Sequence, residues 1–290
     1  MYDGLVLSDL HLGAASSQVR HIQKFLENIP PTRRLVLNGD VLENTEHRLT
    51  KHHWKVLSQL RKLSDQLELV WVIGNHDFEA DAIAHLIGAT FVPRYEFSSG
   101  DKGVLCIHGH TWDNFITDHP MLTMAADWIY LSLQKMNRKL AVSAKRSSKT
   151  FLRCIEKVRV KALDYCRQHG WDIVVCGHTH HAEIARRNDH DCVSNPPIYF
   201  NTGCWTDHIC HYWTIENGLT ELHEVTAVEP ADALSRAAEG QPKLLIVLRA
   251  DAGTHTQFHA PAREHVKRGD LFGQQRRMPQ IVAEYIAADP

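Results

Sequence analysis

The sequence predicts an α/β fold built around a largely parallel β-sheet, or around two such sheets packed face to face. Short apolar runs rich in β-branched residues recur along the chain, and their length suits strands buried on both faces. Helical patterns lie between several of these runs, as expected when crossover helices connect parallel strands. The predicted strands are residues 5–7, 35–37, 69–73, 104–107, 173–176 and 198–200.

Two amphipathic helices are predicted between the first three strands. Apolar residues recur every three or four positions from Val19 to Ile29, and again from His52 to Leu63. We expect each helix to turn its apolar face to the sheet.

Residues from about 111 to 170 interrupt this alternation. Helix formers dominate there and turn signals are few, so we expect a helical insertion between two strands. Its part from Lys135 to Arg167 holds eleven Lys or Arg residues against two acids. Trp128 belongs to an apolar, aromatic face upstream, and Lys149 and Arg153 stand at helical i, i+4 spacing. These three are predicted substrate contacts. The alternative is that the apolar face packs on the core and the charges are solvated.

The chain is expected to divide at about residue 228. Residues 1–228 would form the main domain with its insertion. Residues 229–290 would form a C-terminal extension of unknown role, which begins with a linker containing Pro, Ala and Gly. A strand is expected near residues 244–248 and a short helix near 281–287.

Composition restricts the class of protein. The formal net charge of −2 gives no global argument for a nucleic-acid or anionic-membrane partner. The seven cysteines form no CxxC pair and suggest reduced thiols in the cytoplasm. No run reaches the ~18 apolar residues that span a bilayer. We therefore expect a cytoplasmic protein, at most peripheral on the cytoplasmic face of the membrane through its basic insertion.

Five polar clusters, each after an apolar run, carry the chemistry. Open α/β sheets place ligands beyond the carboxyl ends of their strands, so these clusters should converge. Mixed Asp, Asn and His donors suit borderline divalent ions, with manganese favoured and iron or zinc as alternatives. The clusters are Ser8-Asp9-Leu10-His11, Asn38-Gly39-Asp40, Gly74-Asn75-His76-Asp77, His108-Gly109-His110 and Gly177-His178-Thr179-His180.

In this order the clusters resemble the motifs of the calcineurin-like metallophosphoesterases, over residues 1 to about 226. The resemblance implies an αββα sandwich with a helical cap, and two divalent metals whose bridging hydroxide attacks a phosphate ester. It also implies the role of each residue. His76 would be the acid outside both metal spheres, and Asp77 would orient it. The first metal would take Asp9, His11, Asp40 and His180, and the second Asp40, Asn75, His108 and His178.

Within that superfamily the chain looks most like the UDP-2,3-diacylglucosamine hydrolases, which cut a nucleotide-lipid pyrophosphate beneath a helical cap. The Ser-Asp-Leu-His-Leu-Gly start and the later Asn-Thr-Gly-Cys-Trp carry this closer likeness. Two departures put that lipid in doubt, because the lipid A hydrolases often have Arg at the position of His76 and many relatives have Asp at that of His110. Glu43 could assist a ligand or simply begin a helix.

Other functions remain open at this point. A generic phosphodiesterase for cyclic nucleotides or small diesters, a protein phosphatase and a nuclease share the same metal chemistry. A nuclease would more often show a broad basic track with aromatic platforms, whereas here the basic excess is confined to one segment, so no nucleic-acid partner is expected. A non-catalytic scaffold should lack some of the ligands, and this chain has them all.

Overall fold

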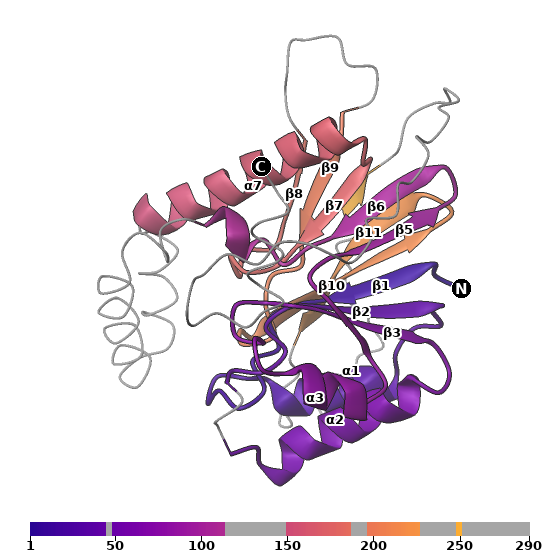
Figure 1. Ribbon diagram of the computed structural model, residues 1–290, viewed down its shortest axis with the longest axis vertical. Coiled ribbons are helices and arrows are strands. Elements are labelled where there is room, and N and C mark those ends of the chain that lie inside the picture. The colour runs from indigo at the N-terminus through magenta and orange to yellow at the C-terminus, as the bar shows by residue number, and fades with distance from the viewer. Residues whose placement is uncertain (45–47, 114–148, 187–195, 227–247, 251–290) are drawn as a thin grey trace, which may run out of the picture.

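A computed structural model describes residues 1–44, 48–113, 149–186, 196–226 and 248–250. The chain forms two mixed sheets packed face to face (Figure 1). The first sheet has seven strands in the order β12-β11-β10-β1-β2-β3-β4. These strands are β1 (Gly4–Leu7), β2 (Arg34–Asn38), β3 (Glu68–Val72), β4 (Thr90–Val92), β10 (Ile209–Glu216), β11 (Leu219–Thr226) and β12 (Leu248–Ala250).

The second sheet has five strands in the order β5-β6-β7-β9-β8. Its central strands β6, β7 and β9 run parallel, as do β1 to β4 in the first sheet. Antiparallel strands complete both sheets, so the expected largely parallel arrangement holds only for part of each. The strands are β5 (Tyr95–Ser99), β6 (Lys102–Cys106), β7 (Ile173–Cys176), β8 (Glu183–Arg186) and β9 (Ile198–Asn201).

Helices cover the outer faces of this sandwich (Figure 1). Helices α1 (Val19–Glu27), α2 (Lys51–Leu63) and α3 (Asp81–Leu86) pack against the first sheet, and their apolar residues share a buried core with it. Helix α7 (Lys149–His169) packs against the second sheet, and the short 3-10 helix η1 (His110–Trp112) lies beside it. The predicted α/β sandwich is confirmed.

The predicted insertion is described only at its two ends. Residues 114–148, which include Trp128, lie outside the described residues, between η1 and α7. Of the C-terminal extension only β12 is described, and it pairs antiparallel with β11. It begins at the last residue of the strand expected at 244–248. The helix expected at 281–287 lies outside the described part. Within that part, no helix combines the length and apolar composition needed to cross a bilayer.

Candidate metal centre

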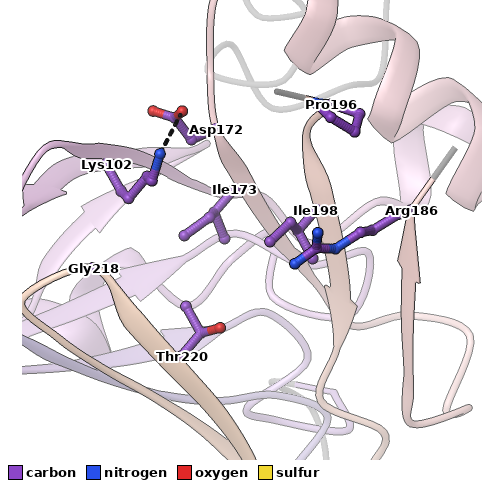
Figure 2. Close-up of a pocket in the computed structure, with 8 residues that line it drawn as sticks. All are labelled: Lys102, Asp172, Ile173, Arg186, Pro196, Ile198, Gly218 and Thr220. Carbon is purple, nitrogen blue, oxygen red and sulfur yellow. Dashed lines mark ion pairs between the residues drawn. The ribbon is translucent and has the colours of Figure 1, made fainter. Parts of the chain in front are cut away.

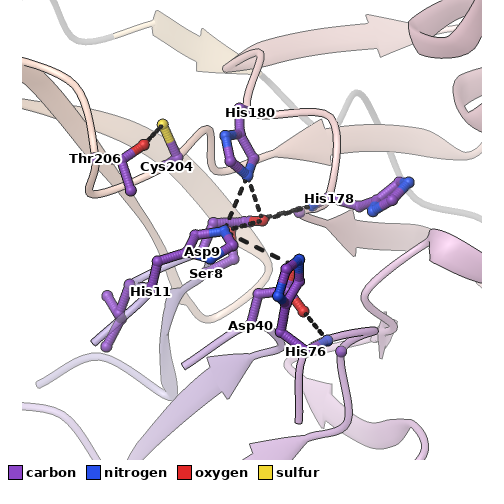
Figure 3. A network of polar contacts seen from close by, with 12 residues as sticks. Ser8, Asp9, His11, Asp40, His76, His178, His180, Cys204 and Thr206 are labelled. Atoms are coloured by element: carbon purple, nitrogen blue, oxygen red, sulfur yellow. Dashed lines mark hydrogen bonds and ion pairs between the residues drawn. The ribbon is translucent and has the colours of Figure 1, made fainter. Parts of the chain in front are cut away.

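The five polar clusters meet at one edge of the sandwich, beyond the carboxyl ends of strands from both sheets. β1, β2 and β3 lead into the clusters with Asp9, Asp40 and Asn75, while β6 and β7 lead into those with His108 and His178. In Figure 3 the side chains of His11 and His180 converge on Asp9, with Asp40 and His76 on neighbouring loops. The spatial convergence expected from the sequence is therefore present.

The backbone itself is unusual at this edge. Six non-glycine residues of the described chain have positive φ, and five of them are predicted metal ligands. Such left-handed conformations are uncommon for residues with a Cβ and gather at functional sites. These five residues are Asp9 (54°), His11 (46°), Asp40 (52°), His178 (65°) and His180 (57°).

The predicted first sphere brings two histidine nitrogens against two carboxylates. His180 Nε2 lies 3.1 Å from Asp9 Oδ1, and His11 Nε2 lies 3.8 Å from Asp40 Oδ2. The Nε2 atoms of His11 and His180 are only 3.1 Å apart. Two acceptor nitrogens and two carboxylates at these separations are what a shared cation would bring together.

The predicted second sphere shares Asp40 with the first. His108 Nε2 is 3.2 Å from Asp40 Oδ2, and His178 Nδ1 is 3.0 Å from Asn75 Oδ1. His108 is fully buried, and Asp40 Oδ2 lies beside its Nε2 without the geometry of a hydrogen bond. A buried polar atom in that state is costly unless something else binds it, so the donor set fits a divalent ion.

In three of the predicted ligand histidines, the ring nitrogen that is not the proposed metal ligand has its own hydrogen-bond acceptor. His11 Nδ1 lies 2.7 Å from Glu43 Oε2, and His108 Nδ1 lies 2.9 Å from the Asn38 carbonyl. His178 Nε2 lies 3.1 Å from Asp113 Oδ2. Such partners fix the tautomer of a ligating imidazole. Sequence reasoning raised Glu43 but missed Asp113, which has no motif spacing to the other ligands.

The charges at the site are strongly coupled. Burial opposes ionisation of Asp40, yet His108, His11 and His76 together hold the pKa of that carboxyl well below its usual range. Burial likewise disfavours the imidazolium of His108, but Asp40 and Asp9 raise its pKa to about 10. Burial and the nearby histidines lower the pKa of His110 to about 3. Asp40 is thus favoured as the carboxylate and His110 as the neutral imidazole, the forms in which both can accept a cation.

His76 and Asp77 do not form the expected pair. His76 Nδ1 lies 2.8 Å from the Glu43 carbonyl, and its backbone N–H donates to Asp40. The buried Asp77 carboxylate instead accepts hydrogen bonds from Trp71 Nε1 and from backbone N–H groups at 41, 42 and 74. Burial, followed by the charge of Asp40, raises the pKa of Asp77 to about 6. Asp77 therefore anchors the loops, while the Glu43 carbonyl orients the His76 ring.

A second layer of polar residues supports these loops. The Ser8 hydroxyl bonds to that of Thr202 at 2.6 Å, and the N–H of Trp205 donates to the Asp9 carbonyl. Asn201 Nδ2 donates to the carbonyl of Gly177 at 2.6 Å. The Asn-Thr-Gly-Cys-Trp segment thus backs the loops that carry Asp9 and His178.

The predicted substrate contacts are only partly described. Arg153 is exposed on α7, and the next residue, Cys154, donates its thiol to Asp113 at 3.1 Å. Lys149 begins α7, but its side chain lies outside the description, as does all of Trp128.

A small pocket at the opposite edge of the sandwich contains none of the predicted ligands (Figure 2). It lies near the starts of β6, β7 and β9, and Lys102 and Asp172 form an ion pair of 3.5 Å across its rim. The pocket is therefore at the amino ends of these strands, whereas α/β sheets bind ligands at the carboxyl ends, where the metal centre lies.

Comparisons with known proteins agree with this chemistry at the level of a family. A family model described as calcineurin-like phosphoesterase matches residues 5–182. A comparison with curated proteins found no match.

Three solved structures illustrate the resemblance. A predicted phosphoesterase from Streptococcus pneumoniae is 14% identical, with 85% of this chain and 97% of that one covered and a TM-score of 0.39. The phosphoesterase Yfce from E. coli is 15% identical over 75% and 90% of the two chains, with a TM-score of 0.41. Zinc-complexed Vps29 from Entamoeba histolytica is 16% identical over 86% and 99%, with a TM-score of 0.43. Similarities this distant add no argument to the family match.

Proposed function

Because the chain belongs to the calcineurin-like phosphoesterase family, we propose that it is a two-metal phosphoesterase acting on small phosphodiesters. The observation that carries the proposal is that the Asp40 carboxylate contacts histidines of both ligand groups, with His11 at 3.8 Å and His108 at 3.2 Å, and also accepts the N–H of His76. The proposed ligands are those expected from the sequence: Asp9, His11, Asp40, Asn75, His108, His178 and His180. Manganese is the favoured metal, with iron or zinc as alternatives.

Two divalent cations held there would neutralise the phosphoryl oxygens and lower the pKa of a shared water. The residues of the chain supply the rest. Asp40 would help to hold both cations, since its carboxylate lies near histidines of both groups. His76 donates Nδ1–H to the Glu43 carbonyl, which leaves Nε2 for the substrate. A proton on Nε2 would stabilise charge on the phosphate and pass to the leaving oxygen.

A nucleotide-lipid pyrophosphate of the UDP-2,3-diacylglucosamine kind is the second candidate substrate. The observation in its favour is Arg153, an exposed cation on α7 beside Cys154, whose thiol reaches the metal centre through Asp113. Lys149 and Trp128 would add to a cap that binds a diphosphate and acyl chains. Contact of this cap with the membrane surface belongs to the same proposal.

Hydrolysis of bis-p-nitrophenyl phosphate with Mn²⁺ tests the proposed activity. We expect Asp40→Ala to abolish turnover, because both cations lose a ligand. His76→Ala should lower kcat by roughly 10²–10⁴-fold while Mn²⁺ remains bound, since His76 acts only as an acid. His52→Ala, an exposed histidine on α2, should match the wild type. Full activity of Asp40→Ala would contradict the proposal. A wild type without activity in the presence of any divalent metal would also contradict it and would favour a non-catalytic scaffold.

The same protein should then be given cyclic nucleotides, a simple phosphate monoester and UDP-2,3-diacylglucosamine. We expect the small diesters to be turned over. Turnover of the lipid alone would select the second candidate instead.

A further inference from the structure

Asp113 touches the metal centre without belonging to the predicted ligand set. It follows η1 and is buried, with 6% of its surface exposed. Its backbone N–H donates to the His110 carbonyl at 3.0 Å, which holds the residue close to the β6 cluster. Its Oδ2 lies 3.1 Å from His178 Nε2 and accepts the thiol of Cys154 at the same distance.

An ionised carboxylate can only accept hydrogen bonds, so its contact with His178 determines where the imidazole proton lies. The proton of neutral His178 must be on Nε2, which leaves the lone pair on Nδ1. That lone pair faces Asn75 Oδ1 at 3.0 Å, and the amide oxygen is itself an acceptor. Two acceptors facing each other at this distance fit a cation bound by both.

We propose that Asp113 is a positioning residue that fixes the tautomer and orientation of His178 and thereby sets the affinity of the second metal. The inference rests on the proposed function, since it takes His178 and Asn75 as ligands of that ion. The first metal has a separate partner of this kind, because Glu43 accepts from His11. Loss of Asp113 should therefore weaken one ion and spare the other.

The Cys154 thiol extends this contact to α7. Asp113 Oδ2 accepts from both His178 and Cys154, so the helix that follows the insertion shares a carboxylate with the metal ligand. The same three side chains also lie close enough together to hold an ion directly, with ligand atoms within 4.8 Å of one another. In that case His178 Nε2 would be a metal ligand instead of a donor, and the experiment separates the two arrangements.

Titration of the metal-free protein with Mn²⁺ tests the proposal, followed by calorimetry and by elemental analysis after dialysis. We expect the wild type to bind two ions. Asp113→Asn keeps the size of the side chain but replaces a charged acceptor with a neutral amide, whose N–H₂ group can also face His178 and favour the wrong tautomer. It should bind the first ion as before and the second about 10–100-fold more weakly. The electron paramagnetic resonance signal of a coupled Mn²⁺ pair should be lost at metal concentrations that saturate the wild type.

Three further variants complete the experiment. Asp113→Ala should show the same selective loss, and Asp65→Asn, an exposed Asp paired with Arg61, should behave as the wild type. Cys154→Ala should weaken the second ion less than Asp113→Asn does, because the carboxylate remains. Circular dichroism of the metal-free variants checks that each one folds. If Asp113→Ala does not fold, Asp113→Asn still tests the proposal.

The outcomes separate this inference from the function on which it rests. Unchanged affinity of the second ion in Asp113→Asn, while the wild type binds two, overturns the role of Asp113 and leaves the phosphoesterase proposal intact. Equal weakening of both ions also overturns it. Three bound ions in the wild type, with one lost in Cys154→Ala, would show His178 Nε2 to be a ligand and overturn it as well. Failure of the wild type to bind Mn²⁺ or to turn over any phosphoester would instead contradict the proposed function.

Discussion

At the scale of single residues, the candidate metal centre depends on backbone conformations that are costly for residues with a Cβ. Five proposed ligands have positive φ, at about 1–3 kcal/mol for each such position. Hydrogen bonds from neighbouring loops hold them in place. The N–H of His178 donates to Asp9, and that of His76 donates to Asp40. The carboxylates proposed to bind metal therefore also organise the loops around them.

Gly74→Ala is predicted to damage the centre without replacing a ligand. A Cβ on Gly74 would overlap the backbone nitrogen and carboxylate of Asp40, and the backbone cannot move aside as a flexible side chain could. We expect at least a tenfold loss of Mn²⁺ affinity together with lower phosphodiesterase activity, measured by metal titration and steady-state kinetics. Gly170→Ala is the control, because a Cβ there meets nothing within 4 Å and adds only the cost of its positive φ. Wild-type metal affinity in Gly74→Ala would contradict this account.

Single residues also show the limit of sequence reasoning at the site. Asp9, Asp40 and His178 could be found because each follows an apolar run in a recognisable motif. Asp113 could not, because its contact with His178 depends on how η1 and α7 pack. The role predicted for Asp77, orienting His76, has no direct hydrogen bond between the two side chains in the structure, for a related reason. Adjacent residues on a turn can point to different partners, and here the ring of His76 turns to the Glu43 carbonyl.

At the scale of elements, Asn38 joins the two sheets beside the metal centre. It ends β2 in the first sheet, and its buried Nδ2 donates to the carbonyls of Val175 at 2.9 Å and Ile107 at 3.3 Å, both on the second sheet's side. Its own carbonyl accepts from His108. One residue thus aligns β2 with the strand ends that carry the second set of ligands.

Asn38→Ala is predicted to lower the free energy of unfolding by about 1–3 kcal/mol, because two buried carbonyls lose a donor. Urea unfolding of the metal-free protein measures this change. Asn28→Ala removes an exposed amide that, within the described part of the chain, bonds to the Lys24 carbonyl alone, so we expect it to stay within about 0.5 kcal/mol of the wild type. If Asn38→Ala and Asn28→Ala lowered the free energy of unfolding equally, the hydrogen bonds of Asn38 between the sheets would not explain the loss.

Elements differ in how far they could be predicted. β1, β2, β3, β6, β7 and β9 are buried on both faces, so they appear in the sequence as continuous apolar runs. β10 and β11 were missed because they mix exposed and buried residues and carry polar side chains such as His211 and Glu221. The order of strands within each sheet could not be predicted, since it depends on pairings between residues distant in the sequence.

At the scale of the whole molecule, the metal centre lies where the two sheets meet, and each sheet supplies part of it. Asp9, Asp40 and Asn75 follow strands of the first sheet, while His108 and His178 follow strands of the second. Cations bound by both groups would link the sheets to each other. Metal binding should therefore be coupled to the stability of the entire sandwich.

Removal of metal is predicted to lower the melting temperature. An ion present at about 100 times its Kd adds about 2.7 kcal/mol, which corresponds to a shift of about 5–10 °C for a domain of this size class. Calorimetric melting of the protein with EDTA and with Mn²⁺ measures the shift. Asp40→Asn should melt at the same temperature in both conditions, because the carboxylate shared by the two groups is gone, whereas His52→Ala should show the full shift. A wild type that binds two ions but melts unchanged would show that the cations do not link the two sheets.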